Sequence, residues 1–496
     1  MPSVRQAIVY SSAARYVMSF LGLASSMLVS RLLTPDEIGT FAIASAIVMI
    51  MSEFRMLGAG GYLVREEKVT KEKVRSALGL TILVSWGFGI VILVSAWPIS
   101  ILYELPSLAL IFSILSLSFF LAPYISIPAS LLSRKMNFRV QFKIRFYASL
   151  VGFSTTIGLI VMGASYYALA LGQTAVAIVS FVMYSKIRPQ GMVWLPHFKG
   201  ISKVASFGAY TSLASLFRKL TVTMPDMIIG KMGTTAQVGM FSRGLGFIQF
   251  VSQTIIMGMK PVSLPYLSDV KRAGGDLSFA YTRASVMAGG LIWPVLAVAS
   301  IVSLPAIRMF FGDQWDAAAP PASMLAYWAM LRVVHLFAGE LLTAIHKEKI
   351  LALKEGVVVF LYFGGIILSF PRGLLAVAVM FVLVAFADLL FTTAVLVRYA
   401  QIKSVSFFSA WIRTAILTIL CWSVAQLIYM VVSSSSMGMF GALITVAAVL
   451  PLIWVSGLFL VGHSLRFEII NLYDLAKKIS ALSSLLMSRH VVLVVN

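Results

Sequence analysis

Two kinds of residue are scarce in this chain of 496 residues: cysteine and charged residues. The single cysteine, Cys421, excludes an internal disulfide and a cysteine-based metal cluster. Only 11% of the residues are charged, whereas a soluble domain has about a quarter. Because 60% are hydrophobic, the chain could not hide its apolar surface from water inside a globule, and it needs a bilayer as solvent.

Acidic residues are scarcer still, with 18 Asp and Glu against 39 Lys and Arg. A net charge of +21 can indicate nucleic-acid binding, but here the cations are distributed between apolar segments, which is typical of membrane topology. We therefore expect no nucleic-acid partner. The chain also lacks a G-x-x-x-x-G-K phosphate loop, which argues against a built-in ATPase. Its start has no short apolar core before a small-residue cleavage site, so no signal peptide is expected.

Long apolar segments are abundant. A hydrocarbon core about 30 Å thick needs about 20 helical residues, and the chain contains about fourteen segments of that length. The sequence therefore predicts an all-α polytopic membrane protein. The expected spans are 8–30, 38–61, 77–97, 108–131, 146–163, 166–186, 205–230, 237–260, 281–303, 320–345, 350–369, 374–397, 409–432 and 438–461.

The loops between these spans alternate in charge. The even-numbered loops carry clusters of Lys and Arg, including Lys354 in the tenth, whereas the odd-numbered loops hold only Arg31, Lys231, Arg308 and Arg372. An excess of Lys and Arg marks the cytoplasmic face of a membrane. We therefore expect both termini to be cytoplasmic, in a multi-pass protein of the cytoplasmic membrane.

Two stretches exactly two hundred residues apart are similar: RLLTPDEIGTF at 31–41 and KMGTTAQVGMF at 231–241. Both place Thr, Gly and Phe at the same positions and begin with a cation. In each, a helix is expected to end at the cation, and the glycine (Gly39 or Gly239) to let the next helix start close to a neighbour. The pattern favours a duplicated half over coincidence between two membrane turns.

Both turns fall on the external side in this topology, so the halves run in the same direction, and parallel repeats place a substrate path between them. We predict two pseudo-symmetric six-helix lobes followed by two further helices. The expected units are 1–200 (spans 1–6), 201–403 (spans 7–12), 404–464 (spans 13–14) and 465–496. The last is a cytoplasmic amphipathic tail, with Lys477 and Lys478 on its polar side, expected on the membrane surface.

Three stretches resemble one family: RLLTPDEIGTFAIA after the first span, LLSRKMNFRVQFKIR at 131–145, and MFFGDQWDAAAPPASMLAYW at 309–328. They are similar to the polysaccharide transporter (PST, Wzx-type) branch of the multidrug/oligosaccharidyl-lipid/polysaccharide (MOP, or MATE/MOP) flippase superfamily. Lys135 departs from the commonest pattern in the second stretch.

This resemblance implies the MOP flippase fold, with two lobes around a central cavity. It also implies a flippase that translocates undecaprenyl-diphosphate-linked oligosaccharide across the bacterial inner membrane by alternating access. The product would serve exopolysaccharide, capsule or O-antigen (lipopolysaccharide) biosynthesis. A Na+ or H+ gradient would supply the energy, with no other cofactor. Expected partners are the lipid-linked oligosaccharide, membrane lipids, and a polysaccharide polymerase and chain-length regulator.

Several charges lie inside the predicted spans, where each costs at least about 2.5–3.5 kcal/mol unless it faces a cavity. Arginine forks bind phosphate oxygens in pairs, so these cations are candidates for contacting a diphosphate. The candidate substrate-binding residues are Arg15, Arg55, Arg218, Lys219, Arg243, Lys260 and Arg332. The candidate coupling residues are Asp388, Glu340, His335, Asp226 and Glu53.

Structural alternatives stay open for the cations and their neighbours. Arg15, Arg55 and Lys260 could extend their head groups to the membrane surface instead. Arg243 could anchor an interface near the external end. Glu53 could simply neutralise Arg55.

The acids and the tenth span have alternatives too. Arg218 could pair with Asp226 on its own helix or with an acid across the interface between the lobes. In the tenth span Arg332, His335, Gly339 and Glu340 share a helix face, which fits either a substrate and proton-relay stripe or an internal ion pair. Asp388 could bind a coupling cation or make only a polar contact.

Two other functions compete with a flippase. An exporter of small cations from the same superfamily needs an acidic cavity, whereas this one is mostly basic. The second is a membrane glycosyltransferase or ligase, because Asp36 and Glu37 resemble the paired external acids of such enzymes. Those enzymes also need a sizeable external loop to hold an acceptor, whereas the longest external loop here (304–319) is short. We therefore predict no enzyme and no catalytic residue. His197, His346 and His463 lack the companions that a metal site needs.

Overall fold

The computed structural model describes residues 4–55, 59–198, 201, 209–471 and 474, and within these ranges every regular element is a helix. The first half contains α1 (Val4–Leu32), α2 (Pro35–Arg55), α3 (Ala59–Arg65), α4 (Lys71–Leu102), α5 (Ser107–Leu121), α6 (Pro123–Arg134), α7 (Phe138–Val161) and α8 (Tyr167–Ile187). The predicted all-α membrane fold is confirmed.

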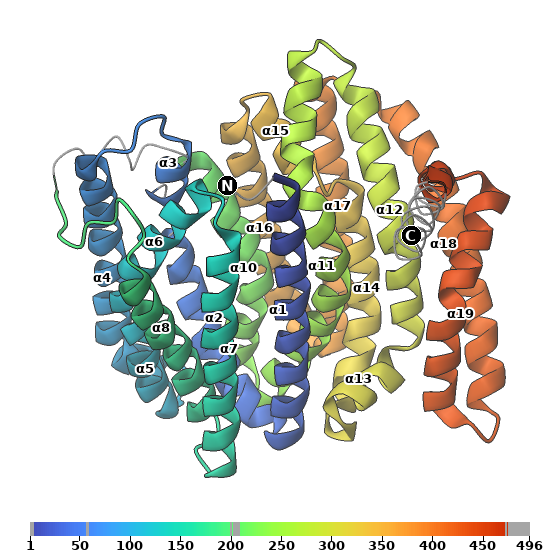
Figure 1. The fold of residues 1–496 in the computed structure, drawn as a ribbon. Helices are drawn as coiled ribbons and strands as arrows, with labels where there is room; N and C mark the ends of the chain where they lie inside the picture. The colour runs from blue at the N-terminus through green and yellow to red at the C-terminus, as the bar shows by residue number, and fades with distance from the viewer. Residues whose placement is uncertain (1–3, 56–58, 199–200, 202–208, 472–473, 475–496) are drawn as a thin grey trace, which may run out of the picture.

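The second half begins with α10 and is followed by a C-terminal helix pair. Its elements are α10 (Ala209–Met232), α11 (Thr235–Arg272), α12 (Leu277–Ile301), α13 (Ser303–Phe311), the short η1 (Asp313–Ala318), α14 (Ala319–Val334), α15 (Ala338–Ala344), α16 (Glu348–Ser369), η2 (Phe370–Arg372) and α17 (Leu374–Ala400). The C-terminal pair is α18 (Ser404–Ser433) and α19 (Gly438–Val461), and it forms the edge of the molecule beyond α12 (Figure 1).

Ten helical segments in the described chain are long and apolar enough to cross a membrane, and an eleventh is the pair α5 and α6, which meet at a 45° bend. The predicted count of fourteen is therefore not confirmed by hydropathy, although helices overlap all fourteen predicted segments. The three helices that fall short are α1, α10 and α11. Two of them, α10 and α11, carry Arg218, Lys219, Arg243 and Lys260, which lower their mean hydropathy.

The turns 31–41 and 231–241 lie at the same end of the bundle, opposite the N-terminus and the end of α19 (Figure 1). Each turn starts a helix by the same device. The backbone N–H of Thr34 donates to the carboxylate of Glu37 (2.8 Å), and that of Thr234 donates to the amide oxygen of Gln237 (3.0 Å). Each threonine hydroxyl accepts a bond in return, which makes two capping boxes.

The glycines of the two turns pack against each other's turn. A methyl group on Gly39 would overlap the carbonyl oxygen of Thr235, and one on Gly239 would overlap the carbonyl oxygen of Pro35. The prediction that each glycine permits a close helix approach is confirmed. The neighbour in each case is the other copy of the repeat, so α2 and α11 cross at their first turns with nothing but hydrogen between the backbones.

Further bonds tie the two halves together at this end, which we call the closed end. Arg31 donates to the carbonyl oxygen of Met309 (2.7 Å), and Lys231 donates to that of Leu102 (2.7 Å). The indole of Trp315 donates to the carbonyl oxygen of Ser30 (2.8 Å). The repeat cations at 31 and 231 thus each satisfy a carbonyl of the opposite half.

The acidic pair Asp36 and Glu37 also forms hydrogen bonds at the closed end. Asp36 accepts a hydrogen bond from the hydroxyl of Thr235 (2.6 Å), and Glu37 accepts from Thr34 and Ser165. Both carboxylates therefore have structural partners in the described chain, which removes the observation that favoured an enzyme.

The tail continues as a helix from Leu465 through residue 471, with Leu465 buried against α12, α18 and α19. Arg283 of α12 donates to Glu468 (3.4 Å). Lys477 and Lys478 lie outside the described residues, so the amphipathic tail stays a prediction, as do the unit boundaries at 200, 403 and 464.

Candidate functional site

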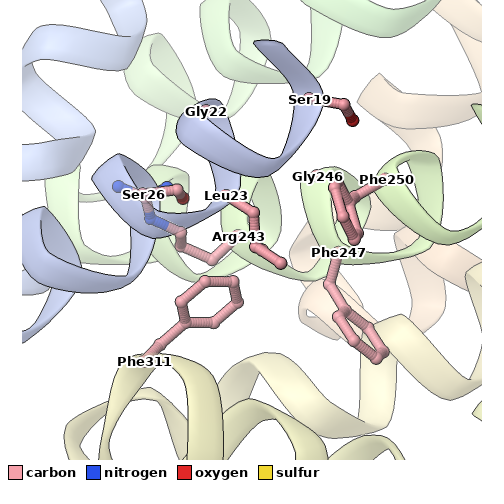
Figure 2. Close-up of a pocket in the computed structure, with 9 residues that line it drawn as sticks. All are labelled: Ser19, Gly22, Leu23, Ser26, Arg243, Gly246, Phe247, Phe250 and Phe311. Atoms are coloured by element: carbon pink, nitrogen blue, oxygen red, sulfur yellow. The ribbon is translucent and has the colours of Figure 1, made fainter. Parts of the chain in front are cut away.

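A cavity of about 310 Å³ lies between the halves, bounded by α1 on one side and α11 on the other (Figure 2). Its lining is apolar apart from two serines and one arginine. The residues that form it are Ser19, Gly22, Leu23, Ser26, Arg243, Gly246, Phe247, Phe250 and Phe311. The arginine is one of the predicted substrate-binding cations.

Two matching helical stripes create this space. The lining residues of α1 and those of α11 both follow the spacing i, i+3, i+4 and i+7, which places each set on one helix face. Gly22 and Gly246 have no neighbouring atom within 4 Å of the position that a side chain would take. The small residues therefore leave a gap instead of closing the contact. Small residues at helical spacing were the signal in the sequence, and our prediction did not use it.

Arg243 is held in place without a counter-ion. Its guanidinium donates to the hydroxyl of Ser26 (2.8 Å) and lies over the rings of Phe311 (5.7 Å) and Trp315 (5.6 Å). Within the described part of the chain no carboxylate lies within 4.0 Å of it, and its buried Nε has no hydrogen-bond partner. An arginine has five N–H donors, so most remain available for an anion.

Arg243 lies about 12 Å along α11 from the closed end, and a second group of charges lies deeper. Lys219 lies in α10 and Glu53 in α2, and these two helices pack against each other across the halves. Lys260 of α11 is 4.0 Å from Glu340 of α15, with 57% of the lysine side chain exposed. Among the predicted cations whose side chains the structure describes, only Arg243 lines this cavity.

Arg218 has a partner that the sequence did not suggest. Its guanidinium is 3.6 Å from Glu355 of α16 and donates to Ser215 of its own helix (3.0 Å). The alternative pairing with Asp226 is wrong, because the Oδ1 atom of Asp226 is buried without a partner in the described chain.

The predicted stripe in the tenth span is wrong, because the helix is broken there. α14 ends at Val334 and α15 begins at Ala338, so Arg332 and Glu340 do not share one helix face. His335 lies in the break, where its two ring nitrogens bond the hydroxyls of Tyr281 (2.9 Å) and Thr393 (2.8 Å). Arg332 packs over the ring of Trp328 at 5.0 Å.

Asp388 is not a lone acid. Lys354 of α16 lies 2.9 Å from Asp388 and 3.3 Å from Glu355, and Thr392 also donates to Asp388 (3.0 Å). The predicted position of Lys354 in a cytoplasmic loop is wrong. Lys354 lies inside α16, which begins at Glu348, and the lysine side chain is only 7% exposed. Neither Lys354 nor Glu355 was predicted as a site residue.

For two of the predicted cations, Arg15 and Arg55, the structure describes the helix but not the side chain. Arg15 lies in α1 and Arg55 ends α2, but both side chains fall outside the described part of the structure. No group of three or more His, Cys, Asp or Glu that could hold a metal ion occurs in the described ranges. Among the histidines, His463 shares a hydrogen bond with the hydroxyl of Thr414 (3.0 Å).

Comparison with known proteins decides the family. The family described as "Polysaccharide biosynthesis protein" matches residues 28–320, which is more than half of the chain and includes both repeat turns. The chain belongs to the polysaccharide biosynthesis protein family. The resemblance that we drew from three short stretches is thereby confirmed.

Relatives that resemble the chain include three named for polysaccharide assembly. Lipopolysaccharide biosynthesis protein WzxC of Escherichia coli is 21% identical over 68% of this chain and 68% of its own length. Teichuronic acid biosynthesis protein TuaB of Bacillus subtilis is 20% identical over 73% and 76%. Succinoglycan biosynthesis transport protein ExoT of Rhizobium meliloti is 23% identical over 60% of each.

Solved structures show that this polysaccharide biosynthesis protein has the MOP fold. The lipid II flippase MurJ in an inward closed conformation aligns over 93% of this chain and 100% of its own, with a TM-score of 0.69 and 15% identity. A multidrug resistance MATE family transporter of the MOP superfamily, facing inward, aligns over 79% and 99%, with a TM-score of 0.60 and 13% identity. The chain is therefore a multi-pass membrane protein of that architecture.

Proposed function

We propose that this protein is a flippase for lipid-linked oligosaccharide repeat units in the bacterial inner membrane, acting in exopolysaccharide, capsule or O-antigen biosynthesis. The observation that carries the proposal is Arg243, a cation that has no counter-ion among the described residues and lines a cavity between the halves. A diphosphate supplies the anion that this guanidinium lacks, and arginine binds phosphate oxygens as a fork.

The walls of the cavity suit the rest of such a substrate. Leu23, Phe247 and Phe250 offer apolar surface beside Arg243, where a polyprenyl chain gains from leaving water. The serines at 19 and 26 add hydroxyls for polar groups of the head. One cavity thus presents complementary chemistry to both ends of a lipid diphosphate.

Alternating access requires that one end of the path be shut while the other opens. The closed end supports this, because Gly39, Gly239 and Trp315 join the two halves there. Substrate then reaches Arg243 from the opposite end, which we assign to the cytoplasm from the distribution of Lys and Arg in the loops, together with both termini.

The energy source is part of the same proposal. We propose a Na+ or H+ gradient, with Glu53 and Asp226 as the acids that remain candidates for coupling. Asp388 and Glu340 are weaker candidates, because Lys354 and Lys260 already lie close enough to neutralise them. A polymerase and a chain-length regulator are the proposed partners that consume the product.

Two alternatives receive less support. An exporter of small cations would bind a cation next to Arg243, which repels it. Similarity to a MATE transporter concerns the fold alone. The acid pair that favoured a glycosyltransferase or ligase, Asp36 and Glu37, instead holds the closed end together, so we assign no catalytic residue.

The experiment is complementation of a deletion strain, with export and the lipid-linked repeat units of the inner leaflet measured together. Arg243→Gln should abolish export and accumulate repeat units, and Arg243→Lys should retain a part, because the charge survives while the fork is lost. Arg372→Gln, which removes an exposed arginine outside the cavity, is the matched control and should export normally. Normal export by Arg243→Gln at normal protein level contradicts the proposal.

A further inference from the structure

A row of alternating charges crosses three helices of the second half. It runs from Arg218 in α10 to Glu355 and Lys354 in α16 and ends at Asp388 in α17, with successive separations of 3.6, 3.3 and 2.9 Å. Two cations and two anions make the row neutral, which is how buried charges are tolerated. Nothing in the family match or in the fold assigns a role to it.

The row is most deeply buried in its middle and most accessible at Arg218. The side-chain exposure is 7% for Lys354, 10% for Glu355 and 17% for Asp388, but 34% for Arg218. The helix that carries Arg218, α10, packs against α2 of the opposite half. Arg218 is therefore the accessible member, next to the boundary where the substrate path is proposed.

The contact between Arg218 and Glu355 is also the weakest in the row. At 3.6 Å it is longer than a charge-assisted hydrogen bond, and Glu355 has Lys354 as a second and closer cation. Lys354 in turn has Asp388 at 2.9 Å. If Arg218 left Glu355, every buried charge would keep a partner, so the exchange leaves no stranded ion.

Resting on the proposed function, we propose that Arg218 is a second, exchangeable anion site. It releases Glu355 to bind the phosphate of a lipid diphosphate, while Lys354 and Asp388 act as positioning residues that hold Glu355. The acid thus competes with the substrate for one guanidinium and limits how tightly the substrate is held in transit.

This mechanism makes an unusual prediction for Glu355→Gln. Removing the competing acid should tighten binding of undecaprenyl diphosphate by about two- to fivefold, the range of a partly exposed ion pair. The KM for transport should fall with it, and kcat should fall because release slows. A merely structural pair would instead lower stability and leave the KM unchanged.

The test measures binding of undecaprenyl diphosphate, and of undecaprenol for comparison, to the full chain in nanodiscs. Glu468→Gln, which removes an acid from the exposed pair with Arg283, is the matched control and should change nothing. Adding Arg218→Gln to Glu355→Gln should abolish the gain. Unchanged or weaker binding by Glu355→Gln overturns the inference, as does a gain that persists without Arg218.

A second variant tests the positioning residues without stranding a charge. Lys354→Met combined with Asp388→Leu removes a neutral pair and leaves Glu355 with Arg218 alone, so binding should weaken. Equal or tighter binding by this double variant contradicts the assignment. Wild-type protein that binds undecaprenol as well as the diphosphate would refute the proposed function itself, whereas wild-type discrimination with no response to Glu355→Gln refutes only the exchange.

Discussion

Replacing Gly39 by alanine should open the closed end. The added methyl group would overlap the carbonyl oxygen of Thr235 and come within 3.0 Å of the backbone nitrogen of Gly239. Both atoms belong to the first turns of α11, whose capping box fixes them, so neither can rotate away. The helices must therefore separate.

The magnitude follows from two terms. Overpacking typically costs about 1–3 kcal/mol, and the upper end applies here because the obstacle is backbone rather than a flexible side chain. Separation also breaks the bond of 2.6 Å from the hydroxyl of Thr235 to Asp36, worth about 1 kcal/mol. A loss of about 3–4 kcal/mol lowers the ratio of closed to open molecules by at least a hundredfold.

The assay is cross-linking at the closed end. Cysteines replace Ser30 and Gln314, whose side chain donates to the carbonyl oxygen of Ser30 (2.6 Å), in a Cys421→Ser background. A short bifunctional maleimide should join them efficiently in the parent and poorly in Gly39→Ala, and export should fall in parallel. Gly87→Ala is the control, because no atom lies within 4 Å of its side-chain position. Full cross-linking and full export in Gly39→Ala would refute the reasoning.

Three other outcomes follow from the structure. Asp388→Asn leaves Lys354 with Glu355 as its only close acid in the described chain and should lower stability by about 1.5–3 kcal/mol, the value of a hydrogen bond to a charged group, seen as a lower melting temperature in detergent, whereas Glu468→Gln should not. Glu37→Gln preserves the capping box and should retain most export, measured by complementation, whereas the enzyme alternative requires loss of activity. Single cysteines at Ser434 and Thr70 should be labelled only from outside and only from inside, respectively, in intact cells; labelling of both from one side would contradict the assigned orientation.

The fold was predictable because it depends on local pattern. Apolar length locates the helices, and the matching residues at 31–41 and 231–241 mark two turns that the structure brings together. Hydropathy alone does not yield fourteen membrane-spanning helices, because α10 and α11 carry charges that a span facing lipid would exclude.

The site was predictable only in part, because ion pairs join helices that are distant in the sequence. Arg218 pairs with Glu355, more than a hundred residues away, although Asp226 is closer along the chain. Lys354 is close in the sequence to a predicted loop, where a cation is typical of membrane topology. Only the structure shows that Lys354 lies inside α16 and is buried. Likewise, no residue type in the sequence predicts the helix break at His335.

The most direct test of the account is translocation by the purified protein alone. Proteoliposomes that contain lipid-linked repeat units in both leaflets, with a glycosidase or oxidant acting only on the outer leaflet, would report the movement of repeat units between leaflets. We predict that wild-type protein makes the inner pool accessible and that Arg243→Gln does not, while Arg372→Gln behaves as wild type. Equal accessibility with Arg243→Gln and wild type, or none with wild type under an imposed Na+ or H+ gradient, would contradict the claim that the cation between the halves carries a lipid diphosphate across the membrane.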